Sequence, residues 1–226
     1  FKHVKGKIIF CGDIGFQLPP VVCRRKNKDG EYEGILMKIY GEKGCVEMTT
    51  EGFDNVRTLT KNYRVKCDKL MNLLKYIRKQ IVNVNEEWRL YGHNTEYVTM
   101  HTVTKKIKKL CSVIKKNEVC GYYKKTDTII CSEKVFMNEY TELFKCIEKY
   151  RVLDNTRDYC NGDIIYEKVK KVKCELRHGF TIHSVQGLTI QKEQKLFIDL
   201  RRMKSLRMLY TALSRARTLS QIYIIF

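Results

Sequence analysis

Short apolar runs alternate with amphipathic segments along most of this chain. The runs are rich in Ile, Leu and Phe, and they occupy positions 7–11, 128–131, 180–183, 196–200 and 222–226. Apolar runs of this length predict buried strands. Leucine and isoleucine at 70, 73, 74 and 77 recur at the spacing of one helix face, which predicts a helix over 66–82. Strands that alternate with helices predict an α/β fold with a mostly parallel sheet flanked by helices.

Local patterns predict four further elements. The β-branched stretch YVTMHTV at 97–103 predicts a strand, and the lysine-rich segment after it predicts a helix over 104–115. The segment after the run at 128–131 predicts a helix over about 135–149. An Asn-Gly pair at 161–162 is a turn signal, so the neighbouring residues predict a small β-hairpin or sheet excursion near 160–178.

The charge of the chain favours a polyanionic partner. Lys and Arg number 44 against 25 Asp and Glu, which gives a formal net charge of +19. A basic excess of this size is typical of proteins that bind the phosphate backbone of nucleic acids. A lysine-rich composition without any such partner is the alternative that the residues leave open.

Cysteine spacing and hydropathy limit the other classes. Ten cysteines occur without a C-x-x-C pair, so we expect reduced thiols and no bound metal. No secretory segment opens the chain, and no apolar run is long enough to cross a membrane. We therefore expect no membrane partner and an intracellular, reducing compartment, with the nucleus or a viral replication site both compatible.

Polar residues follow several of the predicted strands, where ligands bind in open α/β sheets. Asp13 and Gln17 follow the first strand and could orient a metal's water shell and a phosphate or water. Arg64, before the helix at 66–82, could clamp phosphate oxygens through its guanidinium group. Arg215 could stabilise charge on a transferring phosphoryl group. Each has a structural alternative, which is a capped turn for Asp13 and a surface charge for the two arginines.

A second set of residues fits contact with nucleic acid or nucleotide. It follows the strand at 180–183 and comprises Thr181, His183, Ser184, Gln186 and Gly187. The side chains of the set offer hydrogen-bonding groups to phosphates, and Gly187 permits close approach of the backbone.

A lysine cluster forms a third group. Lys105 and Lys106, with Lys108 and Lys109, are candidate contacts to a nucleic-acid backbone, and a solvated helix face is the alternative reading of this cluster.

Four motifs in a fixed order make the chain resemble a known family. They are GD followed by QLPPV, then KNYR, then TIHSVQG, then YTALSRAR. In this order they resemble the later motifs of superfamily 1 helicases, and their form is most similar to the 5′-to-3′ branch that includes RecD and Dda. The resemblance covers nearly the whole chain. It implies two RecA-like domains of the P-loop NTPase type, with ATP and Mg²⁺ between them and single-stranded nucleic acid across both.

The resemblance also implies roles for individual residues. Gln17 resembles the γ-phosphate sensor, and Arg64 and Arg215 resemble the two arginines that the second domain offers to ATP. Asp13 belongs to the same nucleotide motif as Gln17. The loop from His183 to Gly187, with Gln186, resembles the segment that contacts both nucleic acid and nucleotide.

The resemblance further implies a division of the chain. Residues 1–60 would be the end of the first RecA-like domain, and 61–226 the second, with its accessory subdomain reduced to a hairpin near 160–178.

The sequence departs from the family pattern in two respects. Three residues separate Asp13 from Gln17 where the family usually has two, so the loop before Gln17 is one residue longer here. No G-x-x-x-x-G-K-[ST] loop occurs in this sequence, and no strand ending in Asp-Glu precedes Cys11. The family places both upstream, so we expect this chain to be the later part of a longer protein and to be inactive as an ATPase on its own.

The resulting expectation is the C-terminal part of an ATP-dependent DNA helicase that acts in replication, recombination or repair. Its lysine-rich composition suggests a viral or mobile-element origin. Two alternatives stay open on the residues alone. One is a remnant or split subunit without a P-loop that only binds nucleic acid, and the other is an RNA helicase of the same superfamily.

Overall fold

The computed structural model describes residues 24–26, 32–34, 63–91, 95–185 and 188–226, with the backbone alone for 24–26, 32–34 and 86–91. The chain forms two compact units, Phe1–Thr58 and Leu59–Phe226. In the first unit, strands β1 (Arg24–Lys26) and β2 (Tyr32–Gly34) pair antiparallel. The predicted strand at 7–11 lies outside the described residues. The assignment of 1–60 and 61–226 to two RecA-like domains stays a prediction.

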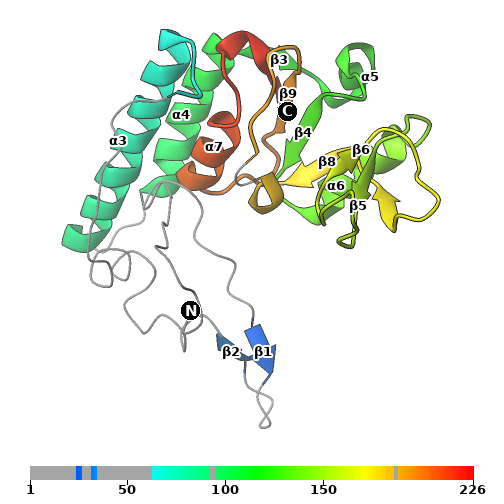
Figure 1. Ribbon diagram of the computed structural model, residues 1–226. Coiled ribbons are helices and arrows are strands. Elements are labelled where there is room, and N and C mark those ends of the chain that lie inside the picture. Colours follow the sequence, from blue (N-terminus) through cyan, green and yellow to red (C-terminus); the bar gives the residue numbers. More distant parts are fainter. Residues whose placement is uncertain (1–23, 27–31, 35–62, 92–94, 186–187) are drawn as a thin grey trace. The chain divides into compact units, whose positions relative to one another are not determined.

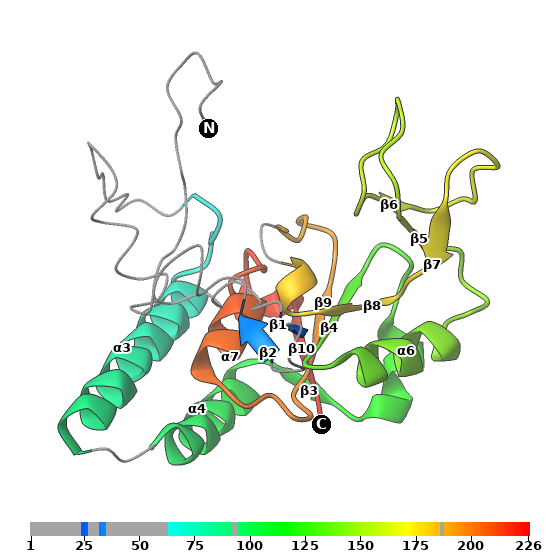
Figure 2. The same cartoon turned by 90° about the horizontal axis from the view of Figure 1, so that it is seen from below.

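The second unit is built on a five-stranded sheet in which every pairing is parallel (Figures 1 and 2). The strand order is β3-β10-β9-β4-β8. The strands are β3 (Ser112–Ile114), β4 (Thr128–Cys131), β8 (Gly179–Thr181), β9 (Leu196–Asp199) and β10 (Ile222–Ile225). The prediction of an α/β fold with a mostly parallel sheet is confirmed, and the apolar runs that predicted strands in this unit correspond to β4, β8, β9 and β10.

Helices cover both faces of this sheet (Figure 2). On one face, side chains of α5 and α6 join Ile129, Phe197 and Ile225 of the strands in one buried cluster. Alternate strand residues such as Ile130 and Ile198 are equally buried and point to the other face, where α3, α4 and α7 lie. The helices are α3 (Asp68–Tyr91), α4 (Glu96–Leu110), α5 (Val119–Tyr122), α6 (Lys134–Leu143) and α7 (Leu206–Leu213).

Helix α4 corrects two of the predicted elements. The stretch YVTMHTV, predicted as a strand, forms the first half of α4, and the predicted helix over 104–115 ends at Leu110, where strand β3 soon follows. Met100, Val103 and Ile107 are the buried residues of α4, and their spacing of three and four is that of a helix face. The β-branched residues favour a strand locally. Burial of Met100, Val103 and Ile107 on one face favours the helix that forms instead.

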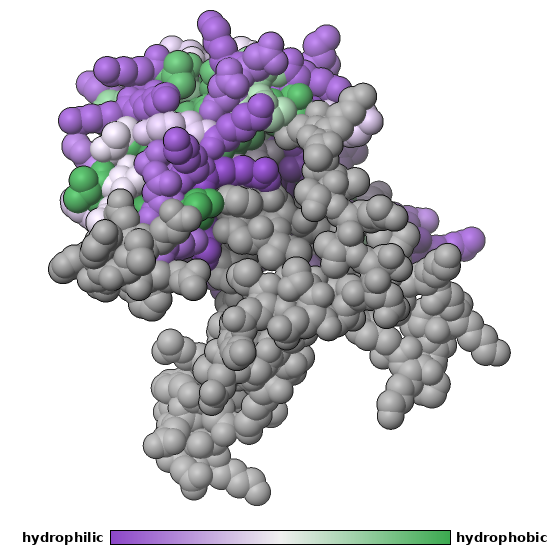
Figure 3. Space-filling model, turned by 90° about the vertical axis from the view of Figure 1, so that its left-hand side faces the viewer, coloured by the Kyte–Doolittle hydropathy of each residue, from purple (hydrophilic) through white to green (hydrophobic). Residues whose placement is uncertain are grey.

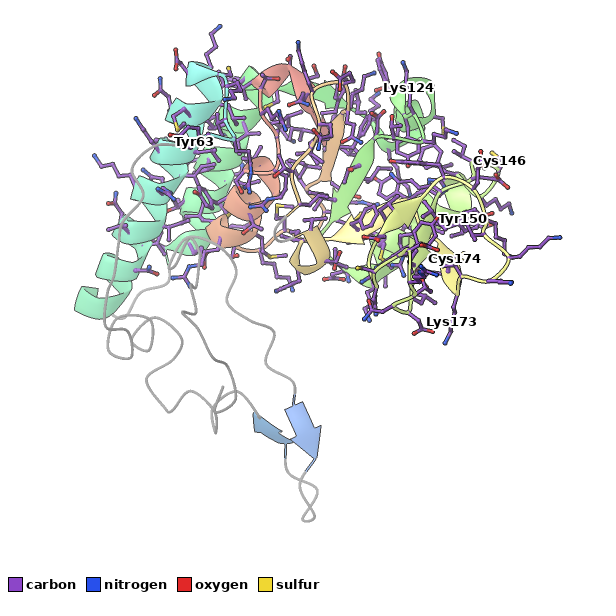
Figure 4. The ribbon with its side chains drawn as sticks, in the orientation of Figure 1. Tyr63, Lys124, Cys146, Tyr150, Lys173 and Cys174 are labelled. Carbon is purple, nitrogen blue, oxygen red and sulfur yellow. The ribbon has the colours of Figure 1, made fainter. Side chains whose placement is uncertain are left out.

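The segment near 160–178, predicted as a β-hairpin or sheet excursion, contributes two strands to a small antiparallel sheet. Its strands are β5 (Tyr150–Val152), β6 (Ile164–Ile165) and β7 (Cys174–Leu176), in the order β6-β5-β7. The turn before β6 contains Gly162 with φ +101°, a conformation that favours glycine. Figure 4 places Tyr150 and Cys174 on this sheet, far from Tyr63 at the start of α3. The excursion therefore lies away from the helices that cover the other end of the unit.

No helix in the described part of the chain is both long and apolar enough to cross a membrane.

A buried lysine, Lys149, lies next to the small antiparallel sheet of β5, β6 and β7. The side chain of Lys149 is enclosed, and its Nζ donates to the Tyr123 hydroxyl at 3.3 Å and to the carbonyl of Asp127. Burial lowers the pKa of Lys149 to about 8. The Nε2–H of His178 donates to the Ile147 carbonyl at 2.9 Å, which leaves Nδ1 to accept from the Tyr123 hydroxyl at 2.9 Å. Burial lowers the pKa of His178 to about 4. Burial raises the pKa of Tyr123.

The lowered pKa of Lys149 predicts a pH dependence of stability. Because the folded pKa lies below the unfolded value of about 10.4, the unfolded chain binds more protons between pH 8 and 10, and stability rises with pH. We expect the free energy of unfolding to rise by about 2 kcal/mol between pH 7 and 9.5, relative to the Lys149→Met variant. Urea unfolding of both proteins at pH 7, 8.5 and 9.5 measures this difference. Parallel pH profiles would contradict a desolvated ammonium group at Lys149.

Candidate nucleotide and nucleic-acid site

Helix α7 carries the YTALSRAR motif, and its sequence explains where it begins. The Ser205 side chain accepts a hydrogen bond from the Met208 N–H at 3.2 Å, which caps the first turn. Leu206, Leu209 and Leu213 are buried and recur at helical spacing. The helix is thus fixed at its start and along its length, and its C-terminal end presents the arginines of the motif at a defined position.

Arg215 is fully buried at the end of α7. Its Nε donates to the Thr211 carbonyl at 3.0 Å, and its Nη2 donates to the Ser214 hydroxyl at 2.8 Å. Its Nη1 donates to the carbonyls of Val185, at 3.4 Å, and Leu188, at 3.2 Å. The guanidinium group therefore fastens the loop that follows β8 to the end of α7.

Arg64 lies beside the same end of α7. Its Nη1 donates to the Ser214 carbonyl at 3.3 Å, and the neighbouring backbone is held by a hydrogen bond from the Lys66 N–H to the Arg217 carbonyl at 2.8 Å. The Arg64 side chain is half-buried. The structure thus brings together Arg64 and Arg215, which the sequence separates widely and which we predicted to act on one ligand.

The loop after β8 carries the predicted nucleic-acid contacts. It opens with the short 3₁₀ helix η2 (His183–Val185), in which the Ser184 hydroxyl donates to the Thr181 carbonyl at 2.8 Å. The Thr181 hydroxyl in turn donates to the Ser184 oxygen at 3.3 Å. His183 and Ser184 are exposed and Thr181 is partly exposed, so all three can reach a ligand. The carboxyl end of β8 presents these groups next to the end of β4.

Four predicted site residues lie outside the described residues. They are Asp13, Gln17, Gln186 and Gly187. Their predicted roles in nucleotide and nucleic-acid binding stay predictions.

The predicted contacts at Lys105 and Lys106 are not grouped with the loop after β8. Both lysines are exposed on α4, which leads into β3 at one edge of the sheet, whereas β8 forms the opposite edge. Four strand spacings separate these edges, which amounts to about 19 Å. A ligand at His183 and one at Lys105 would therefore occupy separate surfaces of the unit.

Arg217 is a neighbouring residue that the sequence reasoning did not single out. Its Nε donates to the Ile190 carbonyl at 3.2 Å, and its Nη2 donates to Gln191 Oε1 at 3.2 Å. It therefore holds the next stretch of the same loop that Arg215 holds. The signal was in the motif, because the second arginine of Ser-Arg-Ala-Arg lies only two residues beyond the first.

The described residues offer no metal site in this unit or elsewhere. Across the described ranges, no group of three or more His, Cys, Asp or Glu side chains lies together in an arrangement that could hold a metal ion. The seven cysteines of these ranges are all unpaired. Burial raises the pKa of the Cys111 thiol to about 12, so this thiol stays protonated at neutral pH.

Comparison with known proteins gives a structural likeness without a sequence match. No protein-family model matches the chain, and no curated protein matches it.

The likeness is to solved structures of one class of helicase. The Pif1 helicase from Bacteroides in complex with ADP-AlF3 and single-stranded DNA is 18% identical, with a TM-score of 0.58 over 92% of this chain and 60% of the other. Bacteroides Pif1 bound to single-stranded DNA is 17% identical, with a TM-score of 0.55 and the same coverage of both chains. Pif1 helicases on forked duplex DNA give 18% identity and a TM-score of 0.55 over 92% of this chain and 58% of the other.

The likeness shows the fold. The second unit has the mostly parallel, helix-flanked sheet of the RecA-like helicase domains. The chain spans about 60% of the length of these helicases, as the 58% and 60% coverage indicates.

Proposed function

We propose that this chain is the C-terminal part of an ATP-dependent superfamily 1 DNA helicase of the 5′-to-3′ branch. The complete protein would couple ATP hydrolysis to movement along single-stranded DNA and to unwinding of the duplex. An upstream RecA-like half, on the same polypeptide or a separate one, would supply the P-loop and the Asp-Glu pair that this sequence lacks.

One observation carries the proposal. The KNYR, TIHSVQG and YTALSRAR motifs converge at the C-terminal end of α7, where Arg64 contacts Ser214 and Arg215 contacts Val185 and Leu188. These motifs lie far apart in the sequence, and a structural role for each alone would not require them to meet. The helicase-like fold supports the same conclusion independently.

The residues at this position suit a phosphate ligand. ATP would supply the anionic γ-phosphoryl group at which charge develops during transfer. Arg64 and Arg215 carry planar guanidinium groups, which pair with phosphate oxygens through two parallel hydrogen bonds. We expect Arg64, as the less buried of the two, to bind the phosphate in the ground state. Arg215 would have to exchange the carbonyls of Val185 and Leu188 for a phosphate oxygen.

The loop after β8 suits a nucleic-acid backbone. Hydroxyl and imidazole groups at Thr181, His183 and Ser184 can donate to phosphate oxygens, and the net charge of +19 favours a polyanion. Two of the Pif1 structures are described as complexes with single-stranded DNA, and one of these also as a complex with ADP-AlF3. We propose single-stranded DNA as the partner on this basis, with RNA as an outcome to be tested.

Steady-state ATPase rates test the proposal. We expect no hydrolysis by this chain alone, and DNA-stimulated hydrolysis by the complete protein extended upstream through a P-loop. The Arg64→Ala change should lower the stimulated rate by about 100-fold, because it removes a preorganised charge next to the phosphate. Single-stranded DNA and RNA oligonucleotides of equal length are compared in the same assay.

The matched control is Lys66→Ala, which removes an exposed positive charge two residues away. It should leave the rate within about twofold, because an isolated surface charge contributes little. A complete protein that hydrolyses no ATP in the presence of either DNA or RNA would overturn the proposal. It would favour a module that only binds nucleic acid. Stimulation by RNA alone would replace the DNA helicase by an RNA helicase.

A further inference from the structure

The outward faces of α3 and α4 carry a basic surface that the proposed function does not use. Buried residues such as Leu70, Leu73 and Ile77 define the inward side of α3, and Val103 and Ile107 that of α4. Helical periodicity places the lysines at 75, 79, 105 and 109 on the opposite, solvent-facing sides, where all four are exposed. Figure 3, which views the α3 side of the molecule, shows mostly hydrophilic side chains over this face.

These lysines are not neutralised by neighbouring carboxylates. Within the described ranges, no ion pair involves any of the four, whereas Lys116, Arg201 and Arg202 are each paired with a glutamate or aspartate. The described acids on the two helices lie elsewhere, with Asp68 in the first turn of α3 and Glu96 accepting a hydrogen bond from the Leu206 N–H at 3.0 Å. Among the described side chains, the four lysines therefore form a basic face without a paired carboxylate.

The aromatic ring on this face is covered. The Nζ of Lys106 lies 3.7 Å from the centre of the Tyr76 ring, at the seam between the two helices. Proteins grip single strands by stacking bases on open aromatic rings. A ring that already holds an ammonium group cannot serve in this way, and Tyr97, which is exposed, lies two helical turns from Lys105. Tyr76, the described tyrosine between the two helices, is thus not available as an open stacking platform.

We propose that the surface formed by Lys75, Lys79, Lys105, Lys106 and Lys109 is a second nucleic-acid site, which binds the backbone of duplex DNA. A duplex presents twice the phosphate charge of a single strand per unit length, and its bases are not available for stacking. A helix face rich in exposed lysines gains most from such a partner. Because the lysines of this face would contact the phosphate backbone and not the bases, binding would not depend on the DNA sequence.

This inference goes beyond the proposed function. The duplex site lies on α3 and α4, which cover one face of the sheet, and the predicted single-strand contacts lie after β8, at the edge strand opposite β3. The two sites can therefore be occupied at the same time. The surface would hold the double-stranded arm of a junction while the loop after β8 contacts the single strand.

The test measures the affinity of the complete protein for a blunt duplex and for a single strand of equal length, by fluorescence anisotropy at several salt concentrations. One variant replaces Lys75, Lys79, Lys105 and Lys109 by serine and keeps Lys106, so that Tyr76 stays covered. We expect its duplex affinity to fall about tenfold or more at 0.15 M salt, and the slope of log K against log salt to decrease by about 2 to 4. Its single-strand affinity should change by less than about threefold.

The matched control replaces four other exposed lysines, Lys124, Lys168, Lys170 and Lys171, which changes the net charge equally. An equal loss of duplex affinity in both variants would show that total charge alone matters and would overturn the site. A loss for the single strand as large as that for the duplex would overturn the duplex assignment. Neither measurement requires ATP hydrolysis, so failure here is distinguishable from failure of the ATPase test.

Discussion

The Arg215→Ala variant is expected to lose both stability and catalysis. Removing the buried side chain leaves the carbonyls of Thr211, Val185 and Leu188 without this donor and opens a cavity, which costs about 3 kcal/mol. For a unit of this size, that cost lowers the melting temperature by about 6 to 12 °C. If Arg215 also stabilises the transferring phosphoryl group, the DNA-stimulated ATPase of the complete protein falls by about 1,000-fold or more.

Two measurements separate the two roles of Arg215. Calorimetry gives the melting temperature, and ATPase rates are measured at a temperature where both proteins are fully folded. The control is Arg217→Ala, which removes a half-buried arginine with two hydrogen bonds and should cost about 1 kcal/mol. An unchanged melting temperature would contradict the role of Arg215 in fastening the loop. A wild-type rate from folded Arg215→Ala would remove it from the catalytic assignment and leave it as a structural residue.

Replacing Asp199 by alanine is expected to destabilise the second unit by about 4 kcal/mol. The carboxylate is fully buried at the end of β9 and accepts hydrogen bonds from the Tyr140 hydroxyl at 2.9 Å and from Arg201 Nη2 at 2.7 Å. Its hydrogen bonds raise the pKa of Arg201. Without the carboxylate, the Tyr140 hydroxyl and one side of the Arg201 guanidinium group lose their acceptor inside the protein, and Arg201 keeps its hydrogen bond to Glu139 at 3.0 Å.

Urea unfolding of the wild type and the Asp199→Ala variant gives the difference in free energy, provided that the two proteins share one m value. The control is Glu133→Ala, which breaks an ion pair with Arg202 whose side chains are 36% and 64% exposed. An exposed pair of this kind contributes less than about 1 kcal/mol. Similar losses from the two changes would show that the buried pair is no stronger than a surface one.

The sequence predicted the strands of the central sheet better than its helices. The runs at β4 and β9 consist almost wholly of residues that are buried on both sides, and such runs have one plausible structure in an α/β protein. The first half of helix α4 was predicted as a strand because several of its residues are β-branched and the stripe formed by Met100, Val103 and Ile107 is thin. The order of the strands depends on pairings between distant residues, which no local pattern contains.

The candidate site was likewise predicted only in part from the sequence. The motifs predicted that Arg64 and Arg215 act on one ligand, which stays a prediction, and the structure places both residues at the same helix end. The sequence did not reveal that Arg215 is buried against three backbone carbonyls, because carbonyl acceptors leave no signature in side-chain identity. The sequence also did not reveal that Lys105 and His183 lie on separate surfaces, since the edge of a sheet to which an element belongs follows only from the strand order.

The position of β10 makes the assembly of the central sheet a late event in biosynthesis. This strand is the last of the five along the chain, yet it lies between β3 and β9 and pairs with both. While the ribosome is still translating β10, β3 has no neighbour to pair with, and its apolar surface has no permanent cover. Contacts between residues so far apart in sequence also slow folding. A nascent chain stalled shortly before Ile222 would therefore be a natural client for chaperones.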